Sequence, residues 1–220
     1  MTLTPMLPVV DDRLPEQPVE FLEGPHKYVH TPTKRVMKYS VTSVVSHFKD
    51  PRDLAAIEAK KHIWAPRGLT VHACLEHHFK GEALLDPGAY ADWVEPLLSH
   101  PTLKQIEPIA SEYRMVDLKR SLGGSFDLLA RWPRNGKVVL FDLKTQGSAS
   151  AQPYDTSVQL GGYLQLLLDC TSGLWIDEIR TIWCRPGKTT FGQDQGVERC
   201  SVAFTEAWQQ FIADQPEDAF

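Results

Sequence analysis

Charged side chains interrupt two apolar segments in the middle of the chain. The segment Val138–Lys144 reads VVLFDLK, and the preceding segment carries Asp127 among small and apolar residues. A charge inside an apolar strand is costly unless it is paired or bound to a metal. An ion pair at a strand end would account for Asp142 and Lys144 by themselves. Two carboxylates converging beside an amine would instead hold a divalent cation, and carboxylate oxygens suit Mg²⁺ or Mn²⁺.

Two paired strands would bring these three side chains together. Apolar residues at both parities of 138–143 predict a strand buried on both faces, and Asn135-Gly136 predicts a hairpin turn before it. A two-residue turn there would set Asp127 opposite Lys144, and a shift by two residues would set Asp127 opposite Asp142. Either register places all three side chains on one face, because side chains alternate with a period of two.

Two helices add polar pairs at a spacing of four residues, which places both members on one helix face. His72 and Glu76 form one pair, in a helix predicted to begin at Pro66, and Gln159 and Tyr163 form the other. Each pair alone is more often part of a solvated face. The order of all four signals along the chain is more specific than any one of them.

That ordered set resembles the motifs of the PD-(D/E)XK nuclease superfamily, in its RecB-like and phage-type exonuclease branch. The matching positions are Gly68 with His72, Gly124 with Asp127, Asp142-Leu143-Lys144, and Gln159 with Tyr163. Phe126 stands where the family name has a proline. The resemblance implies a restriction-endonuclease-like core, with helices flanking a mixed central β-sheet. It also implies a metal-dependent deoxyribonuclease, an exonuclease acting on DNA ends or single-stranded DNA in replication, recombination or repair.

The resemblance further implies roles for individual residues. A Mg²⁺ or Mn²⁺ ion would be held by His72, Asp127, Asp142 and the backbone carbonyl of Leu143. Glu112 is an additional candidate to bind a second ion or to orient the other ligands, and Glu76 is a weaker one. Lys144 would orient or activate a water molecule and offset charge on the phosphate. Gln159 and Tyr163 would steady Lys144 or the scissile phosphate.

The implied partner is DNA, together with proteins of replication or recombination. Candidate DNA contacts are basic and aromatic residues, namely Lys60, Lys61, Trp64, Arg67 and Arg131. Two other classes stay open. One is a catalytically silent nucleic-acid-binding or scaffold module of the same fold, and the other is a zinc hydrolase built on His72, Cys74, His77 and His78. The four cysteines lack the spacing of an iron–sulfur protein, so no such cluster is expected.

Composition and charge set outer limits on these functions. The 220 residues are 42% hydrophobic and 23% charged, as is typical of a globular protein. Taking the four acids of residues 205–220 away from the formal net charge of −5 leaves −1. The charge therefore argues against a protein that coats nucleic acid but permits a local contact. Free cysteines, and the lack of a signal peptide or a bilayer-length apolar run, predict a cytoplasmic protein without a membrane partner.

The pattern of elements predicts an α+β or mixed α/β fold. Residues 1–18 are Pro-rich and expected to be loose, and 19–220 are expected to form a single domain. A small hairpin is predicted within 19–39. Helices are predicted at 40–48, 51–64, 66–80, 91–100 and 157–170, and a last one from Thr205. Strands are predicted at 106–116, 123–132, 137–143, 179–185 and 197–203.

Overall fold

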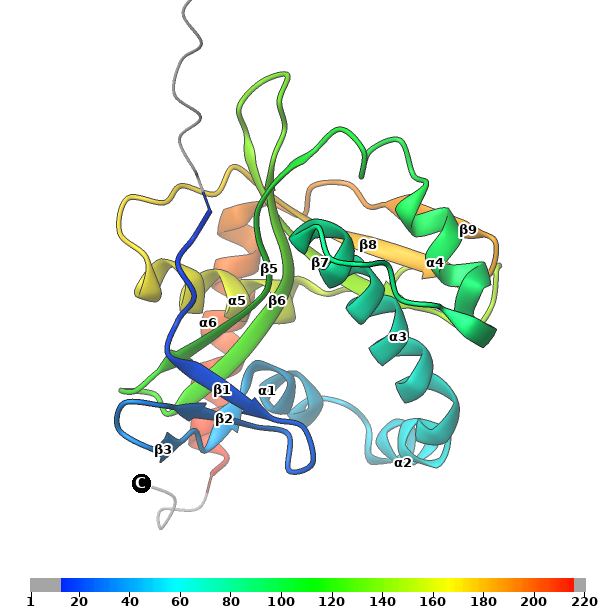
Figure 1. The fold of residues 1–220 in the computed structure, drawn as a ribbon. Coiled ribbons are helices and arrows are strands. Elements are labelled where there is room, and N and C mark those ends of the chain that lie inside the picture. Colours follow the sequence, from blue (N-terminus) through cyan, green and yellow to red (C-terminus); the bar gives the residue numbers. More distant parts are fainter. Residues whose placement is uncertain (1–12, 216–220) are drawn as a thin grey trace, which may run out of the picture.

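The fold contains two β-sheets and a set of helices, which we describe for residues 13–215 in a computed structural model (Figure 1). The strands are β1 (Val19–Leu22), β2 (Lys27–His30), β3 (Arg35–Val36), β4 (Tyr39–Ser40), β5 (Glu107–Asp117), β6 (Leu122–Arg131), β7 (Val138–Thr145), β8 (Glu178–Arg185) and β9 (Lys188–Phe191). The helices are α1 (Val41–His47), α2 (Pro51–Ala59), α3 (Lys61–Lys80), α4 (Ala91–Leu98), α5 (Ser157–Cys170) and α6 (Val197–Ala213), with a short 3₁₀ turn at Gly88–Tyr90.

The larger sheet is mixed, and its central strand β6 has an unusual set of neighbours. Antiparallel β5 pairs with β6 along nearly its whole length. The other edge of β6 is shared by two strands, because β4 pairs with Leu122 and Gly123 while β7 pairs with residues 128–131. Parallel β8 and antiparallel β9 continue the sheet beyond β7. The second edge of β6 is therefore open over residues 124–127, between β4 and β7.

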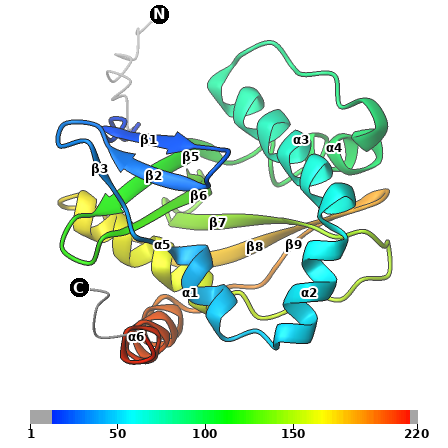
Figure 2. The ribbon, with the colours of Figure 1, turned by 90° about the horizontal axis from the view of Figure 1, so that it is seen from below.

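Helices cover both faces of this sheet, as Figure 2 shows. One apolar cluster joins α3 and α4 to Leu128, Phe141 and Leu143. The other joins α5 and α6 to Phe126 and Leu129. The three-stranded sheet β1–β2–β3 lies on the α3 side, over β5 and β6. The expectation of an α+β fold with helices flanking a mixed sheet is confirmed at this level.

A close contact between β2 and β6 fixes the position of the small sheet. The Tyr28 ring from β2 packs over Gly123 of β6, where an added Cβ would lie 2.6 Å from the ring carbons. Any larger residue at position 123 would push the small sheet away from β6.

One predicted strand is wrong, and two predicted helices have a wrong boundary. Residues 197–203 are the first half of α6 and not a strand, because Cys200 and Phe204 recur at helical spacing and are buried against α5. That packing overrides the β preference of the local sequence. Helix 51–64 ends at Ala59, and Pro66 lies inside α3 instead of opening it. The Trp64 indole supports the intervening turn by donating to the Ile57 carbonyl (2.8 Å). Strand β9 was not predicted.

The N-terminal segment is described only from Arg13 onward, and residues 1–12 lie outside the described residues. The Leu14 N–H donates to the Ile109 carbonyl (3.1 Å), and the Pro15 carbonyl accepts from the Tyr113 hydroxyl (2.7 Å). Residues 13–18 therefore run along β5. Over residues 13–215, no helix combines the length and apolar character needed to cross a membrane.

Candidate metal centre

The candidate centre lies where the paired strands β6 and β7 separate, which we call the fork. Their pairing ends at Leu128–Phe141, so continuing the same register would set Asp127 opposite Asp142. This is the second of the two expected registers. The hairpin uses the loop 133–136 between Trp132 and Lys137, whose backbones are hydrogen-bonded (2.8 Å), instead of a two-residue turn. Past the last pair, the Leu143 N–H donates to the Asp127 carboxylate, which takes the place of a strand partner.

An irregularity in β5 and β6 turns the acidic side chains of both strands toward α3. Phe126 and Leu129 both pack on the α5 side. Residues three apart in a regular strand point to opposite faces, so the alternation of side chains along β6 is interrupted between them. In β5, Glu112 has a φ of 48°, in the left-handed region that residues other than glycine rarely adopt. Such a conformation costs on the order of 1–3 kcal/mol and is concentrated at functional sites. Glu112 and Asp127 thereby both reach His72.

His72, Glu112 and Asp127 form a group that could hold a cation. The His72 Nδ1 lies 2.8 Å from Asp127 Oδ1 and 3.3 Å from Glu112 Oε1. One ligand atom from each residue lies within 4.8 Å of those of the other two. The His72 side chain is 31% exposed and Asp127 only 9%, so the group opens to solvent on the histidine side.

The electrostatics of this group follow from its two carboxylates. Burial alone would lower the pKa of His72, but Asp127 and Glu112 raise it well above 6.5. Burial works to raise the pKa of Asp127, yet His72 and Lys144 hold it below its usual value. Burial raises the pKa of Glu112. A proton on His72 therefore satisfies the two carboxylates, and a divalent cation would offer the same three residues a larger charge.

Asp142 and Lys144 form a second group on the α5 side of the fork. The Lys144 Nζ lies 2.7 Å from Asp142 Oδ2, and the Gln159 Nε2 lies 3.4 Å from Asp142 Oδ1 and 2.8 Å from the Tyr163 hydroxyl. Asp142 Oδ2 is buried and accepts no aligned hydrogen bond. Helix α5 comes this close because Gly124 is small: an added Cβ there would lie 3.2 Å from the Tyr163 ring.

The pair keeps Lys144 positively charged. Burial raises the pKa of Asp142 to about 6, although the Lys144 ammonium opposes that rise. Burial also works to lower the pKa of Lys144, but the neighbouring Asp142 raises it overall. Burial and the Asp142 carboxylate raise the pKa of Tyr163 well above 10, so the phenol stays neutral. The second group thus presents an ammonium and two neutral hydrogen-bonding side chains beside a carboxylate.

The expectation that Asp127, Asp142 and Lys144 share one face is wrong, because the change of alternation in β6 turns Asp127 toward α3 while Asp142 and Lys144 face α5. Within the described chain, Asp142 lies outside the group of three possible ligands, whereas Glu112 belongs to it. Gln159 contacts Asp142 and Tyr163. Glu76 instead pairs with Lys80 (2.6 Å). Leu143 contributes its N–H, and its carbonyl stays a prediction.

The zinc cluster suggested by spacing does not assemble in residues 13–215. Cys74 is buried in the α3-side core, and the His77 Nδ1 lies 3.1 Å from Glu82 Oε2. Neither joins His72 in a group of three possible ligands.

The candidate DNA contacts are scattered. Lys60 lies at the turn between α2 and α3, Lys61 pairs with Glu58 (3.1 Å), and Trp64 is bonded to the Ile57 carbonyl. Arg131 lies at the hairpin end of β6, four residues from Asp127 and about 13 Å along the strand. Arg67 lies on the buried face of α3.

Two tyrosines near the centre were not predicted from the sequence. Burial raises the pKa of Tyr28, and the negative charges of the nearby Glu112 and Asp127 raise it further. Tyr154 packs edge-on against Trp183 (ring centroids 4.9 Å apart), and the charges of Lys144 and Asp142 act on its phenol. Neither lies in a motif. The hairpin that brings Tyr28 to the centre is about a hundred residues earlier in the chain than Asp127.

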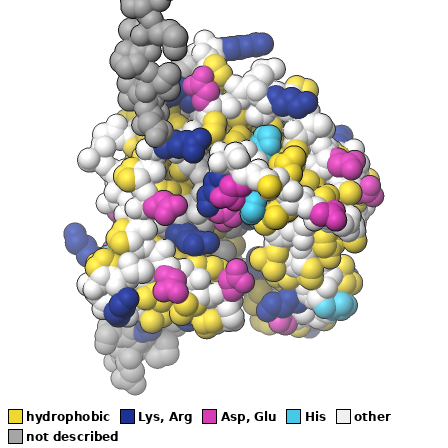
Figure 3. Space-filling view, in the orientation of Figure 1, with side chains coloured by type: hydrophobic (Ala, Val, Ile, Leu, Met, Phe, Trp, Pro, Cys, Tyr) yellow, Lys and Arg dark blue, Asp and Glu magenta, His cyan; other side chains and the backbone are white. Residues whose placement is uncertain are grey.

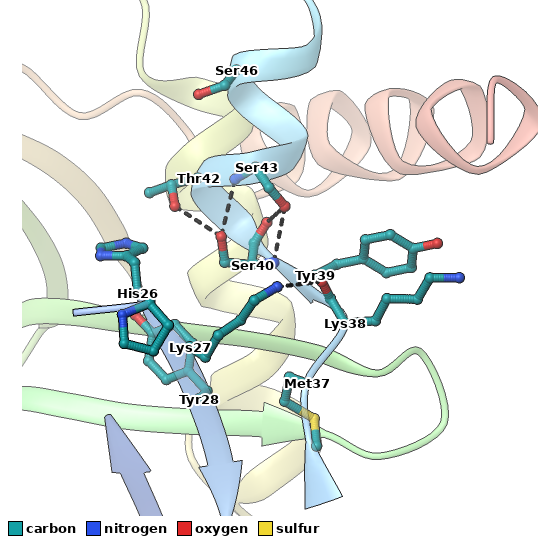
Figure 4. A pocket seen from close by; sticks show the side chains of 11 residues that line it. His26, Lys27, Tyr28, Met37, Lys38, Tyr39, Ser40, Thr42, Ser43 and Ser46 are labelled. Atoms are coloured by element: carbon teal, nitrogen blue, oxygen red, sulfur yellow. Dashed lines mark hydrogen bonds between the residues drawn. The ribbon is translucent and has the colours of Figure 1, made fainter. Parts of the chain in front are cut away.

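A polar pocket of about 280 Å³ adjoins Tyr28 on the side of the small sheet (Figure 4). Its lining includes His26, Lys27 and Lys38, and the Lys27 ammonium donates to the Lys38 carbonyl (3.2 Å). Figure 3 shows basic, acidic and histidine side chains gathered in the middle of one face. They border a hollow between the part that bears the hairpin and the part that bears α2 and α3.

Comparisons with known proteins leave the function open. No protein-family model and no curated protein sequence matches the chain. The crystal structure of a protein designated SSO0001 aligns with a TM-score of 0.38 and 17% sequence identity. The alignment covers 82% of this chain and 78% of that one. A similarity this low supports no conclusion about function.

Proposed function

We propose that the chain is a metal-dependent deoxyribonuclease of the PD-(D/E)XK type, with a restriction-endonuclease-like core. We further propose that it acts in the cytoplasm on DNA ends or single-stranded DNA, alongside replication or recombination proteins. The observation that carries the proposal is the convergence of Asp127, Asp142 and Lys144 at the β6–β7 fork, with His72 approaching from α3. An isolated strand-end ion pair would not need His72, Glu112 and a strained backbone beside it.

The residues present fit a hard divalent cation. Carboxylates and one imidazole suit Mg²⁺ or Mn²⁺, and the imidazole makes Mn²⁺ at least as suitable as Mg²⁺. His72, Glu112 and Asp127 would hold the ion, and Asp142 would stay paired with the Lys144 ammonium through its Oδ2. When bound, such an ion polarises a phosphoryl oxygen and lowers the pKa of a coordinated water.

The remaining residues would stabilise charge on the phosphate and orient the attacking water. Lys144 is charged, so it would offset negative charge developing on the phosphate and hold the attacking water, and would not act as a base. Gln159 and Tyr163 would fix the Asp142 carboxylate and, through it, Lys144. The histidine side of the group is open to solvent, which would give a strand of DNA access to the centre.

The test is substitution at the fork. We expect Asp142→Ala and Lys144→Ala each to slow Mn²⁺-dependent degradation of end-labelled DNA at least about a hundredfold. The matched controls are Asp169→Ala and Lys188→Ala, whose side chains lie at the end of α5 and on β9. The controls should retain parental rates, and circular dichroism should show that all four variants are folded. Parental rates in both fork variants would refute the site.

The choice of substrate separates the proposal from its alternatives. We expect linear single- or double-stranded DNA to be degraded, and cutting of closed circles would refute dependence on ends. Chelation should abolish the activity, and Mg²⁺ or Mn²⁺ should restore it. DNA binding without turnover under any metal would favour a catalytically silent scaffold module. Co-purified zinc with loss of activity in Cys74→Ala would favour the zinc hydrolase.

A further inference from the structure

Arg67 is a buried cation without an anionic partner. It lies on α3, it is 8% exposed, and its Nε is buried with no hydrogen-bond acceptor. Within residues 13–215 no carboxylate pairs with it. An arginine stays charged in a protein, and a buried unpaired charge is strongly unfavourable. Buried arginines are therefore expected to have a counter-ion, and the described residues 13–215 do not supply one.

The surroundings hold the guanidinium in a defined position. It lies over the Trp93 ring of α4, 5.4 Å from the centroid, an arrangement that leaves its edge free to donate. The Trp93 indole donates to the Gln146 carbonyl (2.8 Å), and Arg185 donates to the Gln146 side-chain oxygen (2.8 Å). Gln146, in the segment after β7, is thereby hydrogen-bonded to both α4 and β8.

The guanidinium faces the backbone that leaves the candidate centre. A Cβ built on Gly147 would lie 3.3 Å from Arg67 Nη1, so only glycine leaves this space clear. Gly147 follows Lys144 by three residues, which places it within about 10 Å of Lys144 along the chain. An anion held between Arg67 and Gly147 would therefore lie within reach of the Asp142–Lys144 pair.

We propose that Arg67 binds a substrate phosphate adjacent to the one that is cleaved, with Trp93 holding the guanidinium and Gly147 leaving room for the phosphate. The inference rests on the proposed function and specifies a second phosphate position for it. A guanidinium offers parallel donors that match phosphate oxygens, and a lysine in the same place would offer only a point charge. The phosphate would be either an internal phosphodiester or the terminal monophosphate of a strand.

The first experiment compares Arg67→Met, Arg67→Lys and Gly147→Ala with the parent and with a control, Arg199→Met, whose side chain is exposed on α6. Substrates are oligonucleotides with a 5′-phosphate, a 3′-phosphate or hydroxyl ends. We expect KM to rise at least about tenfold in Arg67→Met, less in Arg67→Lys and Gly147→Ala, and not in the control, with kcat changed less than KM. A rise confined to phosphorylated ends identifies a terminal phosphate, and an equal rise on all substrates identifies an internal one. Unchanged KM in all three variants overturns the inference.

The second experiment measures binding without turnover. Fluorescence anisotropy of the same oligonucleotides without divalent metal, and stabilisation of the folded chain by inorganic phosphate, should both weaken in Arg67→Met. If the parent never degrades DNA yet shows this Arg67-dependent binding, the proposed function fails while the phosphate site stands. If the parent degrades DNA and binding is the same with and without the Arg67 guanidinium, the phosphate site fails and the proposed function stands. Gly147→Ala retains the Arg67 side chain but narrows the space beside its Nη1, and it covers the case in which Arg67→Met does not fold.

Discussion

At the scale of single residues, the centre divides into two groups of side chains. One group can hold a proton or a cation, and the other donates hydrogen bonds from a charged ammonium. His72, Glu112 and Asp127 share one proton on the imidazole side, whereas Lys144 remains charged beside Asp142. Under the proposed function, the first part would bind the metal and the second would stabilise charge on the phosphate. It also means that the metal-free and metal-bound centres differ by a proton.

The first prediction follows from that proton. A metal-ligating histidine must be neutral, and the pKa of His72 lies well above 6.5 in the metal-free chain. Below that raised pKa, each ion bound must release a proton, so the apparent Mn²⁺ affinity should increase with pH, by up to about tenfold per unit, and level off once His72 is neutral. Calorimetric titration of the metal in buffers of different ionisation enthalpy would measure both the affinity and the released proton.

The variant His72→Gln tests the assignment of the released proton. It should bind Mn²⁺ more weakly than the parent, with a much flatter pH dependence between pH 6 and 8. A parental pH dependence in His72→Gln would show that another group releases the proton. His78→Gln, a neighbouring histidine outside the group of three, is the matched control.

At the scale of elements, the site depends on two helices that reach opposite sides of one strand fork. Helix α3 brings His72 to Asp127, and α5 brings Gln159 and Tyr163 to Asp142. Helix α5 is itself backed by α6 at a very close contact. A Cβ on Gly161 would lie 1.9 Å from the Cys200 carbonyl oxygen, and backbone atoms cannot move aside as a flexible side chain can.

The second prediction concerns this helix contact. Gly161→Ala should force α5 and α6 apart and lower the free energy of unfolding by about 2–3 kcal/mol or more. Urea denaturation monitored by tryptophan fluorescence would measure the loss. Gly24→Ala is the control, because a Cβ there meets nothing within 4 Å, and it should stay within about 0.5 kcal/mol of the parent. Equal midpoints for the two variants would contradict the close packing.

At the scale of the whole molecule, the charge distribution is mixed and slightly acidic. The formal net charge is −5, and acidic and basic side chains are interspersed on the face that carries the hollow (Figure 3). Because acidic side chains interrupt the basic ones on this face, the proposed function would have DNA held there at few phosphates, among them those near Lys144 and Arg67. Bound cations would reverse the local effect of the carboxylates.

The third prediction is a shallow salt dependence. For single-stranded DNA the logarithm of the binding constant falls with the logarithm of salt concentration by about 0.7 per phosphate contacted. With about three contacts, the expected slope is roughly −2. Anisotropy titrations of the inactive Asp142→Ala variant over a range of salt concentrations would measure it. A slope steeper than about −5 would mean an extended basic contact and contradict local binding.

Local patterns marked most of the residues that meet at the candidate centre and predicted most of the elements. The strand periodicity marked Asp127, Asp142 and Lys144, and the four-residue spacing marked His72 and the Gln159–Tyr163 pair. These features are local because helices and strands repeat at fixed intervals. Where local preference and packing disagreed, as in residues 197–203, the local pattern predicted the wrong element.

Other features were decided only when distant segments met. Two registers differing by two residues present the same side chains on the same face, so the pattern could not choose between them. The loop 133–136 set that register, and the irregular backbone of β5 and β6 turned Glu112 and Asp127 toward α3, whereas Asp142 faces α5. Likewise, nothing near Arg67 in the sequence indicates that Trp93 and Gly147 surround it. The sequence by itself determined which residues could do chemistry. The tertiary structure decided which of them share a charge, because electrostatic interactions depend on distance in space and not along the chain.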